Sequence, residues 1–502
     1  MGQVGDEVSG TVTTPEGRRR YRERLRSQLG VLRRLLDDGA FTTDDTMTGM
    51  EVELALVDPA ARPSRANRDV LRTLADPDVT TELGSHTIEV NVPPARMQRD
   101  GAVALEEDLR ARMEAADAAA RAHGARVVMI GIVPTLLPED QREGWMTRSP
   151  RYRALDEAVR AQRGEDLLLD IRGEDERLLA HSPSIAPEAA CTSVQLHLQA
   201  SPEDFAAVHN AAQLLAGPQV ALAANSPFYA GRRLWDESRL PVFAQATDSR
   251  PPELAAQGVR ERVLLGHEWT SSAYALFEDS VLHYPPLLPE LAEEDALRVF
   301  ARGGVPRLAE LKMQNGTVWR WNRPVYDVVD GAPHLRVENR LLPSGPTVLD
   351  MAANAAFWFG AVRALADRDR RPWERGALPF SIARASLDAG AQRGLRSTLW
   401  WPDERTGRAE ERDAADLVRR TLLPLVHEGL TSWGVDQGAI DRYLGVLDER
   451  ARTRQTGAQW QHDAVAAAEG RGADRHEALH GMLTRYAELM RDGGAVGGWP
   501  AG

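Results

Sequence analysis

The sequence predicts an α+β protein with a curved antiparallel sheet, whose concave face is polar and whose other face packs against helices. Four short segments alternate strictly between apolar and polar residues, which indicates strands with two different faces. Their polar positions are rich in Glu, His, Gln and Arg, and Lys is absent from them and Asp nearly so, whereas an ordinary solvated face mixes Lys, Thr, Ser and Glu. Segments with helical periodicity lie between them, which makes the fold mixed. An antiparallel sheet permits such two-faced strands.

The first alternating strand is Thr48–Val57, in which Glu51 and Glu53 share one face and apolar side chains fill the other. Two carboxylates about 7 Å apart along a hydrophobic strand are costly unless a cation binds them. A divalent cation is one explanation. An edge strand with its polar face in water is the other, and this segment alone leaves both open.

Three further strands repeat the pattern and favour a shared functional face. They are Thr87–Val92 with Glu89, Ser193–Gln199 with Gln195 and His197, and Leu335–Leu341 with Arg336, Glu338 and Arg340.

The other elements follow from periodicity and from the positions of Pro and Gly. Expected helices are 15–38, 67–75, 101–123, 152–163, 201–216, 305–311, 347–366, 411–430, 436–452 and 460–491, and further expected strands are 125–133 and 316–321. Residues 134–190 are expected to form a long excursion over the sheet. We expect a disordered tail at 1–14, a catalytic domain at 15–455, and a helical extension with a Gly-rich tail at 456–502.

Composition excludes several classes of function. The net charge of −13 leaves no basic face for nucleic acid or anionic lipid. Lys312 is the only lysine, so no Gly-Lys-Ser/Thr phosphate loop exists. Cys191 is the only cysteine, which rules out an internal disulfide and favours a reducing cytosol. The apolar helix 347–366 contains charged residues and is expected in the core, and no signal peptide is expected, so we predict a cytoplasmic protein.

The polar face predicts a metal and phosphate site. Its candidate ligands are Glu51, Glu53, Glu82, Glu89, His197 and Glu338. This oxygen-rich set suits Mg²⁺ or Mn²⁺ better than zinc, and so many acids require more than one cation or a cation cluster shared with phosphates. Candidate phosphate or carboxylate partners are Arg340, Arg320, Arg323 and Arg232. Together they describe an ATP site built on a sheet, in which Arg340 would stabilise the transferred phosphoryl group.

Several motifs in order resemble the glutamate–cysteine ligase superfamily, and more closely its bacterial carboxylate-amine ligase branch. They are Gly49-x-Glu51-x-Glu53, Glu82 with Glu89, Gln195-x-His197, Asn225-Ser226-Pro227-Phe228 with Gly231-Arg232, and Val337-Glu338-Asn339-Arg340. Weaker likeness continues through Ala383-Arg384-Ala385 and Thr456-Gly457-Ala458-x-Trp460-Gln461.

The resemblance implies a glutamine-synthetase-like sheet and an ATP-dependent ligase that forms an amide through an acyl phosphate. It assigns the six candidate ligands to Mg²⁺ or Mn²⁺, assigns Arg340, Arg320 and Gln195 to the nucleotide, and assigns Arg232 and Arg239 to a glutamate-like carboxylate substrate. Glu53 and Arg340 would be catalytic. The loop from Arg232 to Arg239 lacks a Gly-Tyr pair expected of relatives. Cysteine, another amino acid or a small amine remains open as the acceptor, as does a homo-oligomeric state.

Other functions remain possible on the sequence alone. The same acids would also suit a metal-dependent hydrolase, or a non-catalytic homologue that only binds nucleotide. The segment His476-Glu477-Ala478-Leu479-His480 matches a zinc-protease motif, but little chain follows it to supply a third ligand, so we interpret it as a solvated helix face.

Overall fold

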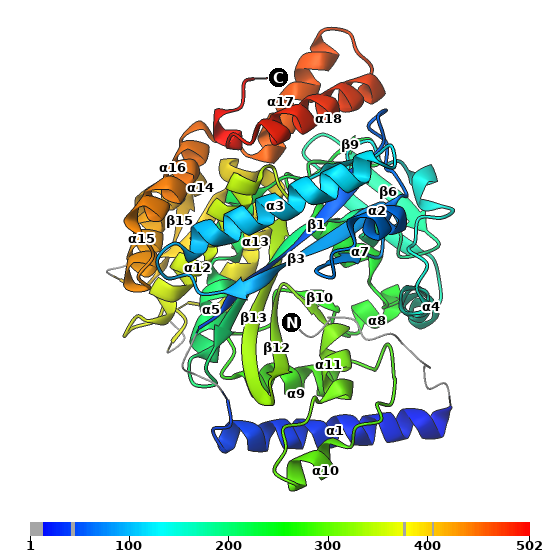
Figure 1. Ribbon diagram of the computed structural model, residues 1–502, viewed down its shortest axis with the longest axis vertical. Helices are drawn as coiled ribbons and strands as arrows, with labels where there is room; N and C mark the ends of the chain where they lie inside the picture. Colours follow the sequence, from blue (N-terminus) through cyan, green and yellow to red (C-terminus); the bar gives the residue numbers. More distant parts are fainter. Residues whose placement is uncertain (1–13, 42–45, 375–377, 404–405, 502) are drawn as a thin grey trace.

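The computed structural model describes residues 14–41, 46–374, 378–403 and 406–501 (Figure 1). The predicted disordered tail, 1–14, lies outside the described residues except for Thr14. Seven strands form one antiparallel sheet in the order β12–β13–β7–β1–β3–β2, and β4 pairs with the free end of β1. The strands are β1 (Thr48–Val57), β2 (Val79–Thr81), β3 (Thr87–Ala95), β4 (Arg126–Val128), β7 (Ser193–Ala200), β12 (Asn322–Val329) and β13 (Ala332–Pro343). The predicted α+β fold with a curved antiparallel sheet is therefore confirmed.

The apolar face of the sheet forms the main core. Met50, Val52, Leu54 and Leu56 of β1 have no exposed surface. Helix α12 (Val348–Ala366) lies in the same core, as predicted, and packs against other helices. These are α3 (Gly101–Arg121), α5 (Phe205–Leu214), α15 (Leu423–Ser432) and α16 (Gln437–Thr453). Burying the apolar side of every strand leaves the polar side facing away from these helices.

The strand expected at 125–133 is shorter than predicted. Of this segment, only the three residues of β4 pair with β1, and the chain leaves the sheet at Met129. There the Met129 carbonyl accepts a hydrogen bond from the Tyr486 hydroxyl at 2.7 Å, in place of a strand partner. Strands β4 and β7 thus lie end to end along one edge of β1, and the gap between them is at Glu53.

Residues 134–190 form a small subdomain beside the sheet. It contains α4 (Pro150–Arg163), a hairpin of β5 (Leu167–Arg172) and β6 (Arg177–Ser182), and the short turn η2 (Glu188–Ala190). Trp145, Val159 and Ile185 belong to a separate apolar cluster that also contains Leu83. This cluster places the subdomain against the loop that carries Glu82.

The C-terminal region differs from its prediction in two places. The helix expected at 411–430 begins with strand β15 (Ala409–Asp413), which pairs with β14 (Thr398–Pro402). The helix expected at 460–491 is two helices, α17 (Gly457–Gly470) and α18 (Arg475–Asp492), because Asp474 caps a new helix with Glu477. Both helices pack onto the main core, at the opposite end of the molecule from α1 (Pro15–Asp37) (Figure 1). The separate extension at 456–502 remains a prediction.

The remaining elements surround these layers. They are α2 (Asn67–Leu74), α6 (Ala216–Ala223), β8 (Phe228–Tyr229), β9 (Arg232–Arg233), α7 (Arg239–Ala246), α8 (Pro252–Ala256), β10 (Val263–Leu264), α9 (Ala273–His283), α10 (Ala296–Ala301), α11 (Ala309–Gly316), β11 (Trp319–Arg320), α13 (Phe380–Arg393) and α14 (Ala414–Leu417). Among the described residues, no helix has the length and apolar character needed to cross a membrane.

Candidate active site

Strand register places the predicted polar residues side by side on one face of the sheet. Glu53 lies opposite Glu89, and Glu51 lies opposite Gln195. On the next strands, His197 lies opposite Glu338, which in turn lies opposite Arg323. Directly opposite residues in an antiparallel pair point to the same face. The face therefore runs from Glu89 at one end to Arg323 at the other.

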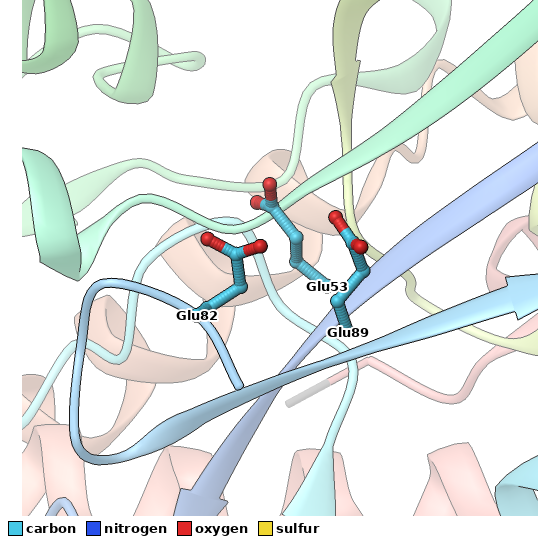
Figure 2. A group of neighbouring side chains, drawn as sticks. All are labelled: Glu53, Glu82 and Glu89. Carbon is cyan, nitrogen blue, oxygen red and sulfur yellow. The ribbon is translucent and has the colours of Figure 1, made fainter. Parts of the chain in front are cut away.

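Three carboxylates form an acidic group at the first end: Glu53, Glu82 and Glu89. Each offers an oxygen atom, and these oxygens lie within 4.8 Å of one another. Glu53 comes from β1, Glu89 from β3, and Glu82 from the loop after β2, and their side chains converge on one space (Figure 2). The Ser193 amide, at the gap between β4 and β7, donates to Glu53 Oε2 at 2.7 Å and holds that carboxylate in place.

The three carboxylates of the acidic group repel one another. Burial and then the neighbouring Glu82 raise the pKa of Glu53 to about 7, against the opposing effects of Arg340 and Arg239. Burial also raises the pKa of Glu82, and that of Glu89 well above its usual range. Three crowded carboxylate oxygens are the donor set that Mg²⁺ or Mn²⁺ prefers. The residues thus fit a divalent cation, which would replace the protons that the group otherwise keeps.

At the other end, arginines already pair the carboxylates. Arg323 donates from Nε and Nη2 to the two oxygens of Glu338, each at 2.9 Å, and Arg340 also donates to Glu338. Burial alone would raise the pKa of Glu338, but the two arginines and His197 outweigh it and hold that pKa well below its usual range. We call Glu338, Arg323 and Arg340 the arginine cluster.

His197 lies between Glu51 and Arg336. Its Nε2 is 3.1 Å from Glu51 Oε1, without the alignment of a hydrogen bond. Arg336 Nε donates to His197 Nδ1 at 3.1 Å, which leaves the proton of a neutral ring on Nε2. Burial opposes ionisation of Glu51, yet His197 lowers the pKa of this carboxyl overall. A metal at Nε2 would therefore require this contact to rearrange.

Gln195 joins the two ends. Its Nε2 donates to Glu53 Oε1 at 3.2 Å, and its Oε1 accepts from Arg340. A side-chain amide is suited to this position because it can donate to the acid and accept from the arginine at once.

Comparison with known proteins agrees with this arrangement. A family model described as glutamate–cysteine ligase family 2 (GCS2) matches residues 47–486. The chain belongs to this family. The predicted resemblance to glutamate–cysteine ligases is thereby confirmed, and all six predicted ligands lie within the matched region.

Individual relatives are distant. The chain is 29% identical over 216 residues to a protein of Mycolicibacterium vanbaalenii provisionally named glutamate–cysteine ligase 2-2, a match that covers 42% of this chain and 50% of that protein. The matched region thus spans half the length of that relative. The fold is similar to glutamate–cysteine ligase from Francisella tularensis in complex with AMP, with a TM-score of 0.55, 11% identity and 90% of each chain covered. It is also similar to a bifunctional glutathione synthetase from Pasteurella multocida, with a TM-score of 0.52, 12% identity, and coverage of 94% of this chain and 55% of that chain.

Three arginines predicted for this GCS2 site have other contacts. Arg320 is buried and donates to Asp279 and Ser280 of α9. Arg239 is buried as well, and its three guanidinium nitrogens donate to Glu237 and to the carbonyls of Arg340 and Leu341. It thereby supports β13 directly beneath Arg340.

Arg232 lies on the β8–β9 hairpin, and its side chain is 58% exposed. Its nearest acidic partner is Glu176 at 3.9 Å, on the turn between β5 and β6. The structure thus brings Arg340 and Gln195 to the acidic group, but not Arg320 or Arg232. The roles assigned to these residues remain predictions.

One acidic residue near the site was not among the predicted ligands. Glu188 lies in η2, and the charged groups that act on its carboxyl are Glu82, Glu53 and Arg340. No periodicity marked it in the sequence, because it lies in an irregular turn of the 134–190 subdomain.

The zinc-protease motif is placed elsewhere, on α18. Its Glu477 serves the helix cap with Asp474, and His476 is exposed. Within the described part of the chain, the acidic group is the one set of three or more potential ligands that lies close enough to hold an ion.

Proposed function

We propose that this GCS2 protein is an ATP-dependent carboxylate–amine ligase that activates the γ-carboxylate of glutamate and joins it to cysteine or another amine. One observation carries the proposal: three convergent carboxylates lie on the same sheet face as Arg340, and Gln195 links Glu53 to that arginine. Cations are needed to bring ATP to such an acidic face, and an arginine fork is needed to stabilise the phosphoryl group in transfer.

The reaction has two steps. A carboxylate oxygen of the substrate attacks the γ-phosphorus of ATP, the bond to the β,γ-bridging oxygen breaks, and ADP leaves. The amine nitrogen then attacks the acyl carbon, the bond from that carbon to the phosphate oxygen breaks, and the nitrogen loses its extra proton. The products are an amide, ADP and phosphate.

The residues of the polar face divide this work. Glu53, Glu82 and Glu89 would hold Mg²⁺ or Mn²⁺, with Glu51, His197 and Glu338 as the further predicted ligands, and bound cations would neutralise the β- and γ-phosphates. Arg340 would stabilise the charge on the transferred phosphoryl group. Glu338 orients Arg340 by accepting its hydrogen bond, and Arg323 in turn holds Glu338 in place.

The test is phosphate release from ATP and Mg²⁺ with purified protein, glutamate and a panel of amines, each omitted in turn. Release that needs both a carboxylate and an amine is the expected result, and it identifies the substrates. Hydrolysis of an amide without ATP would instead identify a metal-dependent hydrolase. Nucleotide binding without any turnover would identify a non-catalytic homologue.

A further inference from the structure

Glu188 is fixed against the loop that carries Glu82. Its amide donates to the Ile185 carbonyl at 2.9 Å, and its carbonyl accepts from the Cys191 amide at 2.9 Å. The next carbonyl, that of Ala189, lies 2.9 Å from where a Cβ at Gly84 would be, so the two segments are in direct contact. The backbone therefore holds Glu188 beside the acidic group, from the side of the 134–190 subdomain.

One oxygen of the Glu188 carboxyl is buried without a hydrogen-bond donor within the described part of the chain. Its Oε2 is fully buried and accepts no hydrogen bond from the described residues. Burial raises the pKa of Glu188 well above its usual range, and Glu82 and Glu53 add to this rise while Arg340 opposes it. A buried acceptor without a donor is destabilising, so a ligand that brings a donor would be favoured here.

The position of Glu188 indicates which ligand would bring this hydrogen-bond donor. Glu188 does not belong to the set of three carboxylates whose oxygens lie within 4.8 Å, which fit a divalent cation without it. Its turn packs on Gly84, two residues after Glu82, and the charges of Glu82, Glu53 and Arg340 all act on its carboxyl. In the proposed reaction the acyl phosphate forms between the acidic group and Arg340. The second substrate, the amine, must reach the acyl carbon of this acyl phosphate. A free amine at neutral pH arrives as an ammonium group, which has three donors and a positive charge, and a carboxylate is its natural partner.

We propose that Glu188 binds the ammonium group of the acceptor amine beside the acyl phosphate. The nitrogen gives one proton to the Glu188 carboxylate, and its freed electron pair then attacks the acyl carbon. This inference rests on the proposed ligase function and identifies the acceptor as a primary amine that enters as a cation, such as an α-amino acid or an aliphatic amine. Glu188 is thus a binding residue of the second substrate, distinct from the residues that handle ATP.

The test is the Glu188→Gln variant, which keeps the shape of the side chain but removes its charge. Phosphate release gives kcat and KM for the amine. Exchange of ¹⁸O between the bridging and non-bridging positions of ATP, with carboxylate but no amine, reports the first step alone. We expect the KM for the amine to rise about 10- to 100-fold, because a charge-assisted hydrogen bond is lost, and the exchange rate to fall far less. Glu143→Gln, an exposed glutamate of the same subdomain, is the matched control.

Other outcomes would overturn the inference. Loss of ¹⁸O exchange that higher Mg²⁺ restores would make Glu188 a metal ligand instead. An unchanged KM for the amine, in a wild-type protein that does require amine, would refute this inference but not the ligase. Absence of amine-dependent release in the wild type would count against the proposed function itself. Glu188→Asp keeps the charge and should show an amine KM closer to that of the wild type, which separates loss of charge from faulty folding.

Discussion

The two ends of the polar face balance their charges in opposite ways. In the arginine cluster, the Glu338 carboxylate accepts two 2.9 Å hydrogen bonds from Arg323, and its pKa is lowered. In the acidic group, Glu89 faces Glu82 and Glu53, and its pKa is raised well above the usual range. Both ends are built on glutamates of one sheet face, from neighbouring strands and, for Glu82, from the loop after β2. Only the arrangement of arginines differs between them.

This difference shows which end needs a cation. The arginine cluster is satisfied by the protein itself. In the acidic group, burial and the neighbouring carboxylates outweigh the arginines that act on Glu53 and Glu82, and the pKa values of all three carboxyls are raised. We therefore expect the first cation to bind at Glu53, Glu82 and Glu89. Binding at Glu51, His197 or Glu338 would require the contacts of these residues with one another or with arginines to rearrange.

The largest effect is expected from Glu53→Gln, which removes a carboxylate from the acidic group. Turnover should fall about 10³-fold, because cation-assisted charge neutralisation is worth several kcal/mol in such a transfer. The measurement is ATP-dependent phosphate release, with Glu143→Gln as a control for loss of an exposed glutamate. Normal turnover in Glu53→Gln would remove Glu53 from the metal site.

Glu338→Gln tests the arginine cluster directly. It leaves the buried guanidinium of Arg323 without its carboxylate, so the free energy of unfolding should fall by about 3–5 kcal/mol. Urea unfolding of the metal-free protein measures this. Glu89→Gln, the matched change in the acidic group, should leave the metal-free protein as stable or more stable, because it removes repulsion. Two variants destabilised equally would contradict the contrast between the two ends.

Arg340→Lys keeps the positive charge but loses the planar fork. We expect kcat to fall about 10²-fold, because a point charge cannot replace donors aimed at the transferred phosphoryl group. The affinity for nucleotide should change much less. Steady-state kinetics and equilibrium nucleotide binding measure the two quantities, and an equal loss in both would show that Arg340 acts only in binding.

A smaller effect is expected in the pH dependence of stability and of Mg²⁺ binding, because the acidic group keeps protons that Mg²⁺ must replace. In the metal-free protein the pKa of Glu53 is raised to about 7, so folded chains keep a proton that unfolded chains lose near pH 4.3. Stability should therefore decrease as pH rises across this window and then level off. Mg²⁺ should add more to the free energy of unfolding at pH 8 than at pH 5.5, by on the order of 1 kcal/mol. Melting temperatures with and without Mg²⁺ at the two pH values measure this. The same Mg²⁺ effect at both pH values would show that these carboxyls are already ionised.

The smallest effect is expected away from the polar face. His476→Ala should change ATP turnover by less than about twofold, because His476 is exposed on α18 and outside the acidic group. Loss of activity in this variant would show that the motif on α18 contributes to the reaction after all.

The sequence by itself determined that the sheet has two faces and which residues share the polar one. Strand side chains alternate with a period of two, so Glu51, Glu53 and Glu89 could be assigned to one face without any knowledge of their neighbours. The same reasoning placed His197, Glu338 and Arg340 there. The core position of α12 also followed from its composition, as did the absence of a phosphate loop.

Only the tertiary structure decided which charges meet. Arg323 pairs with Glu338 through the register of β12 and β13, while Arg320, three residues earlier, turns to Asp279. Glu188 reaches the site because its turn packs on Gly84, more than 100 residues away in the chain. Periodicity reports the direction of a side chain within its own element. Register and loop packing are set by long-range contacts, which no local pattern contains.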